Sequence, residues 1–162
     1  MKYEILKDEF IEFDGRKLYR IKALKDFRDV KKGTVGGYIE SEQNLSQEGD
    51  AWVCGNARVY DSARVSGDAW VSGDARVCGD AWVLNRRSVV WFSNVGTENG
   101  TLTVYCGKNG LIATRGCFTG SVEEFLAKSA EVHDEKTKRE YELLIEVARS
   151  RLKEAQGNIW SE

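Results

Sequence analysis

Tryptophan and arginine occupy one recurring position of a six-residue repeat between residues 49 and 84. The stretch reads GDAWVCGNARVYDSARVSGDAWVSGDARVCGDAWVL, so a Trp or an Arg always stands between an Ala and a Val. An arginine guanidinium holds phosphate through two parallel hydrogen bonds, and a tryptophan ring stacks on a base or another ring. The candidate ligand-binding residues are therefore the six at this position: Trp52, Arg58, Arg64, Trp70, Arg76 and Trp82.

Catalytic side chains are sparse in the rest of the chain. The only histidine, His133, falls at the expected turn between two helices, where a solvated or dipole-stabilising role is commoner than that of a base. Cys117 lies near Arg115 and a helix start, which would favour a reactive thiolate, although a packed junction cysteine is the simpler interpretation. A metal site built from several histidines cannot form with one, so we predict no metal. No recognisable catalytic set stands out either, so we predict no catalytic residue and no cofactor.

Composition places few restrictions on the partner. The 162 residues carry a formal net charge of −2, which gives no general attraction to nucleic acid or to an anionic membrane. No apolar run approaches the roughly 20 residues of a membrane helix, and the acidic start MKYEILKDEF is unlike a signal peptide. The four cysteines are too far apart for a zinc or thiol redox motif. We expect a cytoplasmic protein with reduced thiols.

The repeat itself predicts the elements that would carry the six residues. Ala and Val two places apart point to one side of an extended strand, and the Trp or Arg between them points to the other side. Gly-Asp or Gly-Asn follows as a corner, because both residue types tolerate unusual backbone angles. Short strands joined by tight corners in every hexad indicate a mainly β fold, a parallel β-helix.

The hexad run resembles the hexapeptide-repeat left-handed β-helix, in which three hexads make one triangular coil. It departs from that family's pattern by placing Gly-Asp at the corner and by usually lacking Gly directly after the aliphatic residue. The resemblance implies that residues three hexads apart stack about 4.8 Å from one another. All six side chains would then point outward in three stacked pairs: Trp52 with Trp70, Arg58 with Arg76, and Arg64 with Trp82.

Three segments are expected along the chain. Residues 1–34 form an N-terminal hairpin, with Asp14-Gly15 at its turn, that closes one end of the β-helix. Residues 35–86 hold the hexapeptide repeats and begin with an irregular coil, in which Ile39 and Leu45 take the inward position of the alanines. Residues 87–162 form an α+β module.

The α+β module is expected to contain three strands and two helices. SVVWFSNV, TLTVYCG and LIATRGCF indicate three antiparallel strands joined by NG and KNG turns. Ser121 begins the capping box SVEE, which opens a helix ending near Val132. A second helix runs from about Glu135 to Gln156, and Gly157 is its expected stop.

Two further resemblances concern phage proteins. The segment KDFRDVKKGTVGGYIESEQNLSQEGDAWV resembles the start of many uncharacterised bacterial and phage hexapeptide proteins. The module around GCFTGSVEEF is similar to a small module found in phage proteins. Both imply a bacterial or prophage type of protein, and neither implies a reaction.

Exposed columns of Trp and Arg leave two interpretations open. A monomer would not expose stacked Trp side chains to water. Flat faces would therefore pack into a homotrimer that buries the Trp residues and pairs the Arg residues with acids across subunits. Alternatively, the columns would line a pocket between subunits, where Arg holds phosphate and Trp stacks on a ring. The two arrangements can coexist.

These expectations favour a non-catalytic oligomeric binding protein that sequesters a small anionic, nucleotide-type ligand at subunit interfaces. Such a protein would be similar to the sponge proteins that phages use against host immune signals. One alternative is an interaction scaffold that docks on a host protein. The other follows from the hexapeptide resemblance, because many hexapeptide proteins are acyltransferases that use a histidine base and a thioester cofactor.

Overall fold

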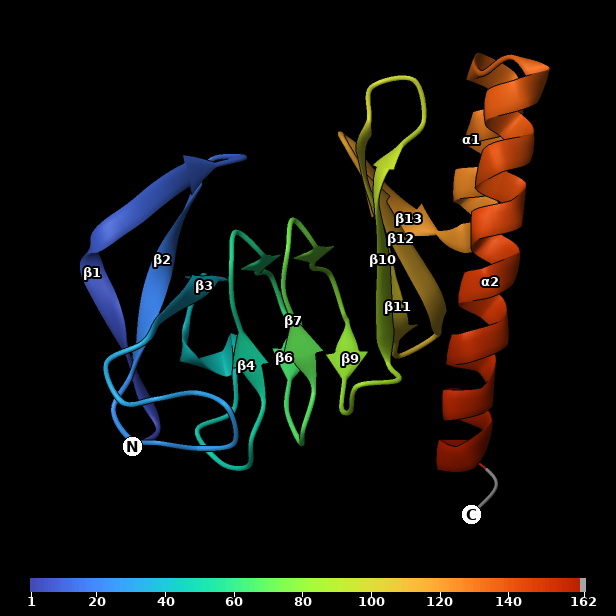
Figure 1. Ribbon diagram of the computed structural model, residues 1–162. Coiled ribbons are helices and arrows are strands. Elements are labelled where there is room, and N and C mark those ends of the chain that lie inside the picture. Colours follow the sequence, from blue (N-terminus) through green and yellow to red (C-terminus); the bar gives the residue numbers. More distant parts are fainter. Residues whose placement is uncertain (161–162) are drawn as a thin grey trace. The chain divides into compact units, whose positions relative to one another are not determined.

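The computed structural model describes residues 1–160 of the chain, with side chains described as far as Leu152. It divides into two units, one of residues 1–86 and one that begins at Arg87 (Figure 1). We call them the repeat unit and the C-terminal unit. No helix among the described residues combines the length and the apolar character needed to cross a membrane.

The repeat unit contains six very short strands, each ending in a buried valine. They are β4 (Trp52–Val53), β5 (Arg58–Val59), β6 (Arg64–Val65), β7 (Trp70–Val71), β8 (Arg76–Val77) and β9 (Trp82–Val83). Strands three hexads apart pair in parallel, β4 with β7, β5 with β8 and β6 with β9, and we call these pairs the first, second and third faces. The predicted stacking of the six Trp and Arg residues in three pairs is confirmed.

Glycine at the corners allows the coils to stack closely. Gly67 has a φ of +63°, and a Cβ built on it would overlap the carbonyl oxygen of Leu84. Gly79 has a similar φ of +67°, but nothing lies within 4 Å of its Cβ position. Backbone conformation therefore favours glycine at both corners, and the close approach of another coil requires it at Gly67.

The coil before the regular repeats is out of step with them. β3 (Val35–Ile39) pairs in parallel with β5 so that Ile39 lies opposite Val59, and Leu45 forms a bridge with Val65. Both residues therefore continue the valine column, and the prediction that they take the alanine position is wrong. At both places the step to the next coil is two positions longer than three hexads, which a hexad count does not reveal.

An N-terminal hairpin extends the second face. β1 (Tyr3–Phe13) and β2 (Arg16–Ala23) pair around a turn at Asp14 and Gly15, whose φ values of 51° and 76° suit this residue pair. β2 pairs antiparallel with β3, which gives the sheet order β1-β2-β3-β5-β8. The predicted hairpin and its turn are confirmed.

The N-terminal segment also covers the start of the first face. Tyr3 packs edge-on against Trp52 with ring centroids 6.4 Å apart, and Phe27 packs in the same way at 5.4 Å. Trp52 is consequently 1 % exposed. The expectation of an exposed tryptophan at this position is wrong, because the chain's own residues bury the ring.

A buried lysine takes the place of a further strand at this end of the first face. Lys2 is 1 % exposed, and its Nζ donates hydrogen bonds to the carbonyl oxygens of Ala51 at 2.7 Å and Gly49 at 3.4 Å. Between coils, such carbonyl oxygens accept from the N–H groups of the neighbouring strand, as Ala69 does from Trp52. The ammonium group thus satisfies carbonyl groups at the edge of the face, and its desolvation lowers the pKa of Lys2 to about 8.

The C-terminal unit begins with a four-stranded antiparallel sheet in chain order. Its strands are β10 (Val89–Val95), β11 (Gly100–Gly107), β12 (Gly110–Arg115) and β13 (Phe118–Ser121). The sequence predicts three strands, but the structure divides LIATRGCF at Gly116, whose φ of +57° makes the turn between β12 and β13. A short apolar run with one internal glycine gives no separate signal for two strands.

Two helices pack on one face of this sheet (Figure 1). α1 (Val122–Val132) begins at the predicted capping box, where Ser121 accepts from the Glu124 N–H at 3.0 Å and Glu124 accepts from the Ser121 N–H at 2.9 Å. α2 (Glu135–Trp160) continues past Gly157, so the predicted stop is wrong, because a glycine weakens a helix without necessarily ending it. The core of the unit includes Leu102, Val104, Ala113, Phe125, Tyr141, Ile145, Ala148 and Leu152.

Candidate functional site

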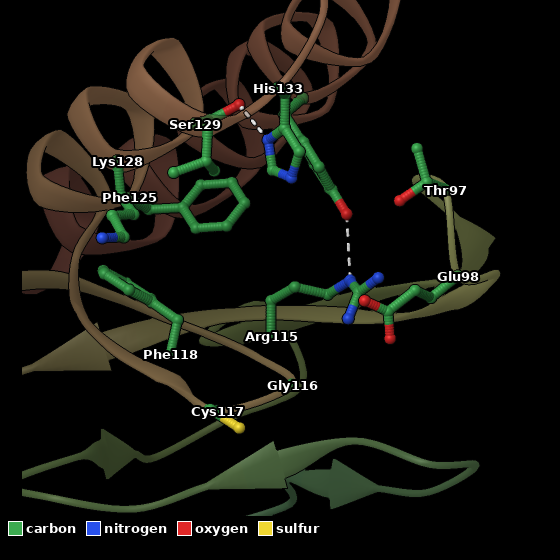
Figure 2. Close-up of a pocket in the computed structure, with 12 residues that line it drawn as sticks. Thr97, Glu98, Arg115, Gly116, Cys117, Phe118, Phe125, Lys128, Ser129 and His133 are labelled. Atoms are coloured by element: carbon green, nitrogen blue, oxygen red, sulfur yellow. Dashed lines mark hydrogen bonds between the residues drawn. The ribbon is translucent and has the colours of Figure 1, made fainter.

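A cavity of about 320 Å³ opens in the C-terminal unit between the turns of the sheet and the two helices (Figure 2). Its volume falls at the lower end of the range of about 300–1,000 Å³ that is usual for small-molecule sites. The side chains that line it come from the β10–β11 turn, from β12 and the turn after it, and from both helices. They include Glu98, Arg115, Phe118, Phe125, Lys128, His133 and Tyr141.

Arg115, at the end of β12, is held in place by a buried tyrosine. Its Nε donates a hydrogen bond to the hydroxyl of Tyr141 at 2.9 Å (Figure 2), and Tyr141 is 1 % exposed. This bond fixes the guanidinium, while Nη1 and Nη2 have no hydrogen-bond partner among the described residues. A guanidinium in this state can bind the oxygens of a carboxylate or a phosphate.

Two glycines leave the room that Arg115 and Tyr141 occupy. A Cβ on Gly100 would lie 2.9 Å from Cζ and Nη1 of Arg115, and a Cβ on Gly96 would overlap the hydroxyl oxygen of Tyr141. Gly96 also has a φ of +75° in the β10–β11 turn. Glycine is therefore required beside the Arg115–Tyr141 pair, at positions where the sequence pattern indicates only a turn.

His133 ends α1 and lies beside the same tyrosine. Its Nδ1 is 2.9 Å from Oγ of Ser129, one turn earlier in the helix, and its ring centroid is 5.4 Å from that of Tyr141. The prediction that His133 occupies the turn between the helices is confirmed. Ser129 is 2 % exposed, so the contact orients the imidazole ring and does not present an accessible nucleophile.

Aromatic side chains form an apolar wall of the cavity. Phe118 and Phe125 pack edge to face with ring centroids 5.5 Å apart, and Phe125 and Tyr141 do so at 5.0 Å. Val132 also lines the cavity and is 57 % exposed. A planar apolar group of a ligand can pack on this wall while a charged group of the same ligand meets Arg115.

The charged residues of the cavity favour an anion. Arg115 and Lys128 are cations, His133 is a third basic group, and Glu98 on the β10–β11 turn is the acid that lines the cavity. Neither Arg115 nor Lys128 has a carboxylate partner in the described part of the chain. The set can therefore bind and orient a small anion.

The sequence indicates Arg115, Cys117 and His133 as three separate residues, and the structure brings all three to one cavity. Cys117 is exposed at the β12–β13 turn. Tyr141 cannot be recognised as a site residue from the sequence, because it falls on the apolar stripe of α2 and reads as core. Lys128 gives no signal either, because one lysine on a helix is typical of a solvated surface.

The six predicted ligand-binding residues lie on three faces of the repeat unit and so are not gathered at one place. Trp52 is buried, and Trp70 is half-buried with the guanidinium of Arg86 5.4 Å from its ring centroid. Arg64 and Trp82 are exposed on the third face. Ligand binding by these residues stays a prediction.

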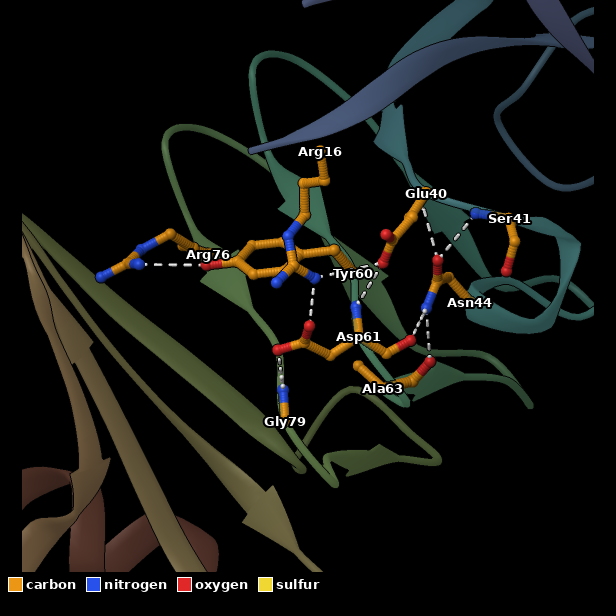
Figure 3. A network of polar contacts seen from close by, with 9 residues as sticks. All are labelled: Arg16, Glu40, Ser41, Asn44, Tyr60, Asp61, Ala63, Arg76 and Gly79. Atoms are coloured by element: carbon orange, nitrogen blue, oxygen red, sulfur yellow. Dashed lines mark hydrogen bonds and ion pairs between the residues drawn. The ribbon is translucent and has the colours of Figure 1, made fainter. Parts of the chain in front are cut away.

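The arginines of the second face pack against the hairpin. The guanidinium of Arg58 lies 4.7 Å from the centroid of the Phe13 ring, and that of Arg76 lies 5.9 Å from it. Arg76 also donates a hydrogen bond to the hydroxyl of Tyr60 at 3.0 Å (Figure 3). Cation–π contacts of this kind stabilise a fold, so packing within the chain explains part of a pattern that is also typical of ligand sites.

A polar network joins the hairpin turn to a corner of the coils (Figure 3). Arg16 forms an ion pair with Asp61, and its Nη1 lies 3.3 Å from Oε1 of Glu40. Asp61 has a φ of +58° at a corner position that glycine fills elsewhere, and its Oδ2 accepts from the N–H of Gly79 at 3.2 Å. Although Nε of Arg16 is buried without a hydrogen-bond partner among the described residues, the opposite charges of the network pair with one another. We therefore interpret the network as an anchor for the hairpin.

Metal ligands are not clustered in the described residues, where no group of three or more His, Cys, Asp or Glu side chains could hold an ion. The four cysteines are free thiols. Burial raises the pKa of Cys106 to about 11, so this thiol stays protonated at neutral pH.

Comparison with known proteins concerns the repeat unit. Residues 51–67 and 63–79 match the family model described as the YdcK beta solenoid repeat. The chain carries β-solenoid repeats. A curated relative, the "Uncharacterized acetyltransferase YdcK" of Escherichia coli K12, is 48 % identical over 44 residues. That match covers 25 % of this chain and 14 % of the relative, so the chain spans only a small part of the relative's length.

Proposed function

We propose that this protein binds a small anionic ligand without transforming it, and that the cavity of the C-terminal unit is the binding site. One observation carries the proposal. Arg115 is fixed by the buried hydroxyl of Tyr141, has unpaired terminal nitrogens among the described residues, and faces a cavity with an aromatic wall. A site of this composition suits a ligand that joins a planar ring to a negative charge.

The proposal takes the ligand to be of nucleotide type, because nucleotides combine a ring with phosphate. Sequestration of a signalling nucleotide, as in the phage sponge proteins, is the biological setting that we propose for such binding. The rigid repeat coils, which we take to be left-handed as the hexapeptide resemblance implies, would serve as the scaffold. Sequestration needs no catalytic group, so it agrees with the donor set of the cavity.

The proposal also includes a homotrimer assembled through the repeat unit. Trp82 is 39 % exposed, Leu84 is 37 % exposed, and Arg64 is exposed beside them on the third face. Apolar side chains of this size on a flat face suit contact with a second copy. Arg64 and Trp82, which are exposed on this face, would then form a second, interfacial place for the same class of ligand.

A thermal-shift screen of the full chain against nucleoside monophosphates, cyclic nucleotides, NAD derivatives and acetyl-CoA tests the proposed function. We expect a nucleotide to raise the melting temperature of the wild type, since a ligand that binds only the folded state stabilises it. The shift should disappear in Arg115→Gln and persist in the matched variant Arg58→Gln. A shift that survives Arg115→Gln and disappears in Arg58→Gln would place the site on the repeat unit instead.

A second candidate function is acyl transfer, because the YdcK relative is named as an uncharacterized acetyltransferase. The relative's similarity lies in 44 residues, and the only histidine of this chain lies in the C-terminal unit. Acyl transfer predicts a thermal shift with acetyl-CoA and a transferase activity that His133→Ala abolishes. A chain that responds to none of these ligands would fit the interaction scaffold, with a host protein docking on the third face.

A further inference from the structure

Three basic groups from two segments line the cavity of the C-terminal unit. Arg115 ends β12, Lys128 lies on α1, and His133 follows the last residue of that helix. Figure 2 shows Lys128 and His133 on the helix side of the cavity and Arg115 on the sheet side. Of the two nitrogens of His133, only Nδ1 has a hydrogen-bond partner among the described residues.

We infer that the charged group bound in this cavity is a phosphate monoester and not a carboxylate, an inference that rests on the proposed function. A carboxylate has two oxygens, and the paired N–H groups of one arginine satisfy both. A phosphate monoester has three peripheral oxygens and a charge of about −1.5 to −2 at neutral pH. It therefore uses donors on more than one side of a site, and this cavity has Arg115 on its sheet side and Lys128 and His133 on its helix side.

The number of donors decides between the two anions. Arg115 alone would match a carboxylate, and Lys128 and His133 would then lack a role in binding. A phosphate held by Nη1 and Nη2 of Arg115 on the sheet side leaves a peripheral oxygen for the helix side, where Lys128 and His133 donate. The ring of the ligand then packs on the wall made by Phe118 and Phe125.

Glu98 provides a second way to distinguish a phosphate monoester from a carboxylate, because its own carboxylate lines the same cavity. Its charge opposes an anion, and it opposes a dianion more strongly than a monoanion. The side chain is exposed on the β10–β11 turn, so water screens this repulsion and keeps it small. Removing the charge should therefore strengthen the binding of a phosphate monoester.

Three probes with the same ring test the inference: phenyl phosphate and benzoate, which carry different charged groups, and benzyl alcohol, which is neutral. Each is titrated into the full chain at neutral pH while NMR records the ring C–H signals of His133, which are unambiguous because the chain has one histidine. We expect saturable shifts, with a Kd for phenyl phosphate about tenfold or more below that for benzoate, since a charged hydrogen bond is added. Benzyl alcohol should bind most weakly.

The outcomes separate this inference from the proposed function. Benzoate binding as tightly as phenyl phosphate would overturn the phosphate inference and leave the anion site standing. If none of the three probes shifts the His133 signals, the cavity is not an anion site and the proposed function fails with it. Binding of benzyl alcohol alone would identify an apolar pocket and overturn both.

Two matched pairs of variants locate the charged group. Lys128→Gln should raise the Kd for phenyl phosphate about tenfold and change that for benzoate much less, whereas Lys136→Gln, outside the cavity, should change neither. Glu98→Gln should lower the Kd for phenyl phosphate about two- to fivefold, with Glu131→Gln as its control. Equal effects of Lys128→Gln on both probes, or weaker phosphate binding by Glu98→Gln, would contradict the inference.

Discussion

The two units differ in how the position of a residue in the sequence relates to the surroundings of its side chain. In the repeat unit the same hexad recurs, and yet Trp52 is 1 % exposed whereas Trp82, at the same repeat position, is 39 % exposed. In the C-terminal unit no hexad recurs, and residues distant in the sequence, such as Glu98, Arg115 and His133, meet at one cavity. Repetition thus specifies a scaffold, and segments outside the repeat decide which recurring side chains stay accessible.

Arg115 of the C-terminal unit also differs from two arginines of the repeat unit in how its guanidinium is satisfied. In the repeat unit Arg16 pairs with Asp61, and Arg76 donates to Tyr60 and packs on Phe13. In the C-terminal unit Arg115 has one hydrogen bond, from Nε, and its terminal nitrogens have no partner among the described residues. An arginine held in position but incompletely paired is a stronger indication of ligand binding than a column of arginines packed by the chain itself.

The largest effect that we predict contrasts two tryptophans of the same repeat position. Trp52→Ala should lower the free energy of unfolding of the repeat unit by about 3–5 kcal/mol, because it leaves a cavity beneath Tyr3 and Phe27. Trp82→Ala should cost a single subunit less than about 1 kcal/mol, measured at protein concentrations too low for assembly, because that ring is then partly in water. Urea unfolding followed by circular dichroism measures both changes. Similar losses of stability for the two variants would show that coverage by Tyr3 and Phe27 adds nothing to the contribution of Trp52.

A second contrast uses two corner glycines with nearly equal backbone angles. Gly79→Ala should lower the free energy of unfolding by about 1–2 kcal/mol, the cost of a left-handed conformation for a residue with a Cβ. Gly67→Ala should lower it by about 1–3 kcal/mol more, because its Cβ would meet the carbonyl oxygen of Leu84. The same urea unfolding experiment checks both variants. Equal costs would mean that the coils can separate at that corner.

The repeat register was largely predictable from the sequence. A period of six with corner Gly-Asp specifies the short strands, and the three stacked pairs follow once three hexads make one coil. The shifted register at Ile39 and Leu45 could not be predicted, because apolar residues six apart fit the alanine and the valine column equally well. Burial of Trp52 could not be predicted either, because it depends on contacts with Tyr3 and Phe27, which lie much earlier in the chain.

The cavity was less predictable than the fold. Capping and hairpin signals located α1 and the turns, and so placed His133 and Arg115 on their elements. Which turns and helices meet is a tertiary property, so no pattern in the sequence connects Glu98 with Lys128. Tyr141 shows why a core pattern can hide a site residue: its ring is part of the core, and its hydroxyl holds Arg115.

The buried Lys2 predicts an unusual pH dependence for the repeat unit. Desolvation lowers the pKa of Lys2 from 10.5 to about 8, so between these values the unfolded chain holds a proton that the folded chain has released. Unfolding then takes up a proton, and the free energy of unfolding should rise with pH from about 8 towards 10, by on the order of 1 kcal/mol per pH unit. Lys2→Met should abolish this rise in urea unfolding measured across that range.

The upper limit of this window comes from two tyrosines. Burial raises the pKa of Tyr60 to about 12 and raises the pKa of Tyr3 as well. Both groups resist ionisation in the folded state, so stability falls again once the unfolded chain's tyrosines ionise near pH 10. Burial also raises the pKa of the Cys54 thiol, which lowers stability at alkaline pH in the same way, so the effect of Lys2 is measured as the difference in pH dependence between the wild type and Lys2→Met. The same pH dependence in both would show that Lys2 is solvated.

The smallest effect on stability, and the sharpest on binding, concerns the hydroxyl of Tyr141. Tyr141→Phe keeps the ring that packs on Phe125 and removes the oxygen that accepts from Nε of Arg115. The free energy of unfolding should fall by only about 0.5–1.5 kcal/mol. The Kd for phenyl phosphate should nevertheless rise about three- to tenfold, because the guanidinium loses its fixed orientation.

Tyr38→Phe in the repeat unit is the matched control, because Tyr38 also packs against an arginine, with the Arg20 guanidinium 4.3 Å from its ring centroid. It should leave the Kd for phenyl phosphate unchanged in the same NMR titration. If Tyr141→Phe also leaves the Kd unchanged, Arg115 binds without being positioned, and the contrast between the two units in how they hold their arginines has no bearing on function. If both variants weaken binding to the same extent, the effect is not specific to the hydroxyl of Tyr141, and the positioning role of Tyr141 is contradicted.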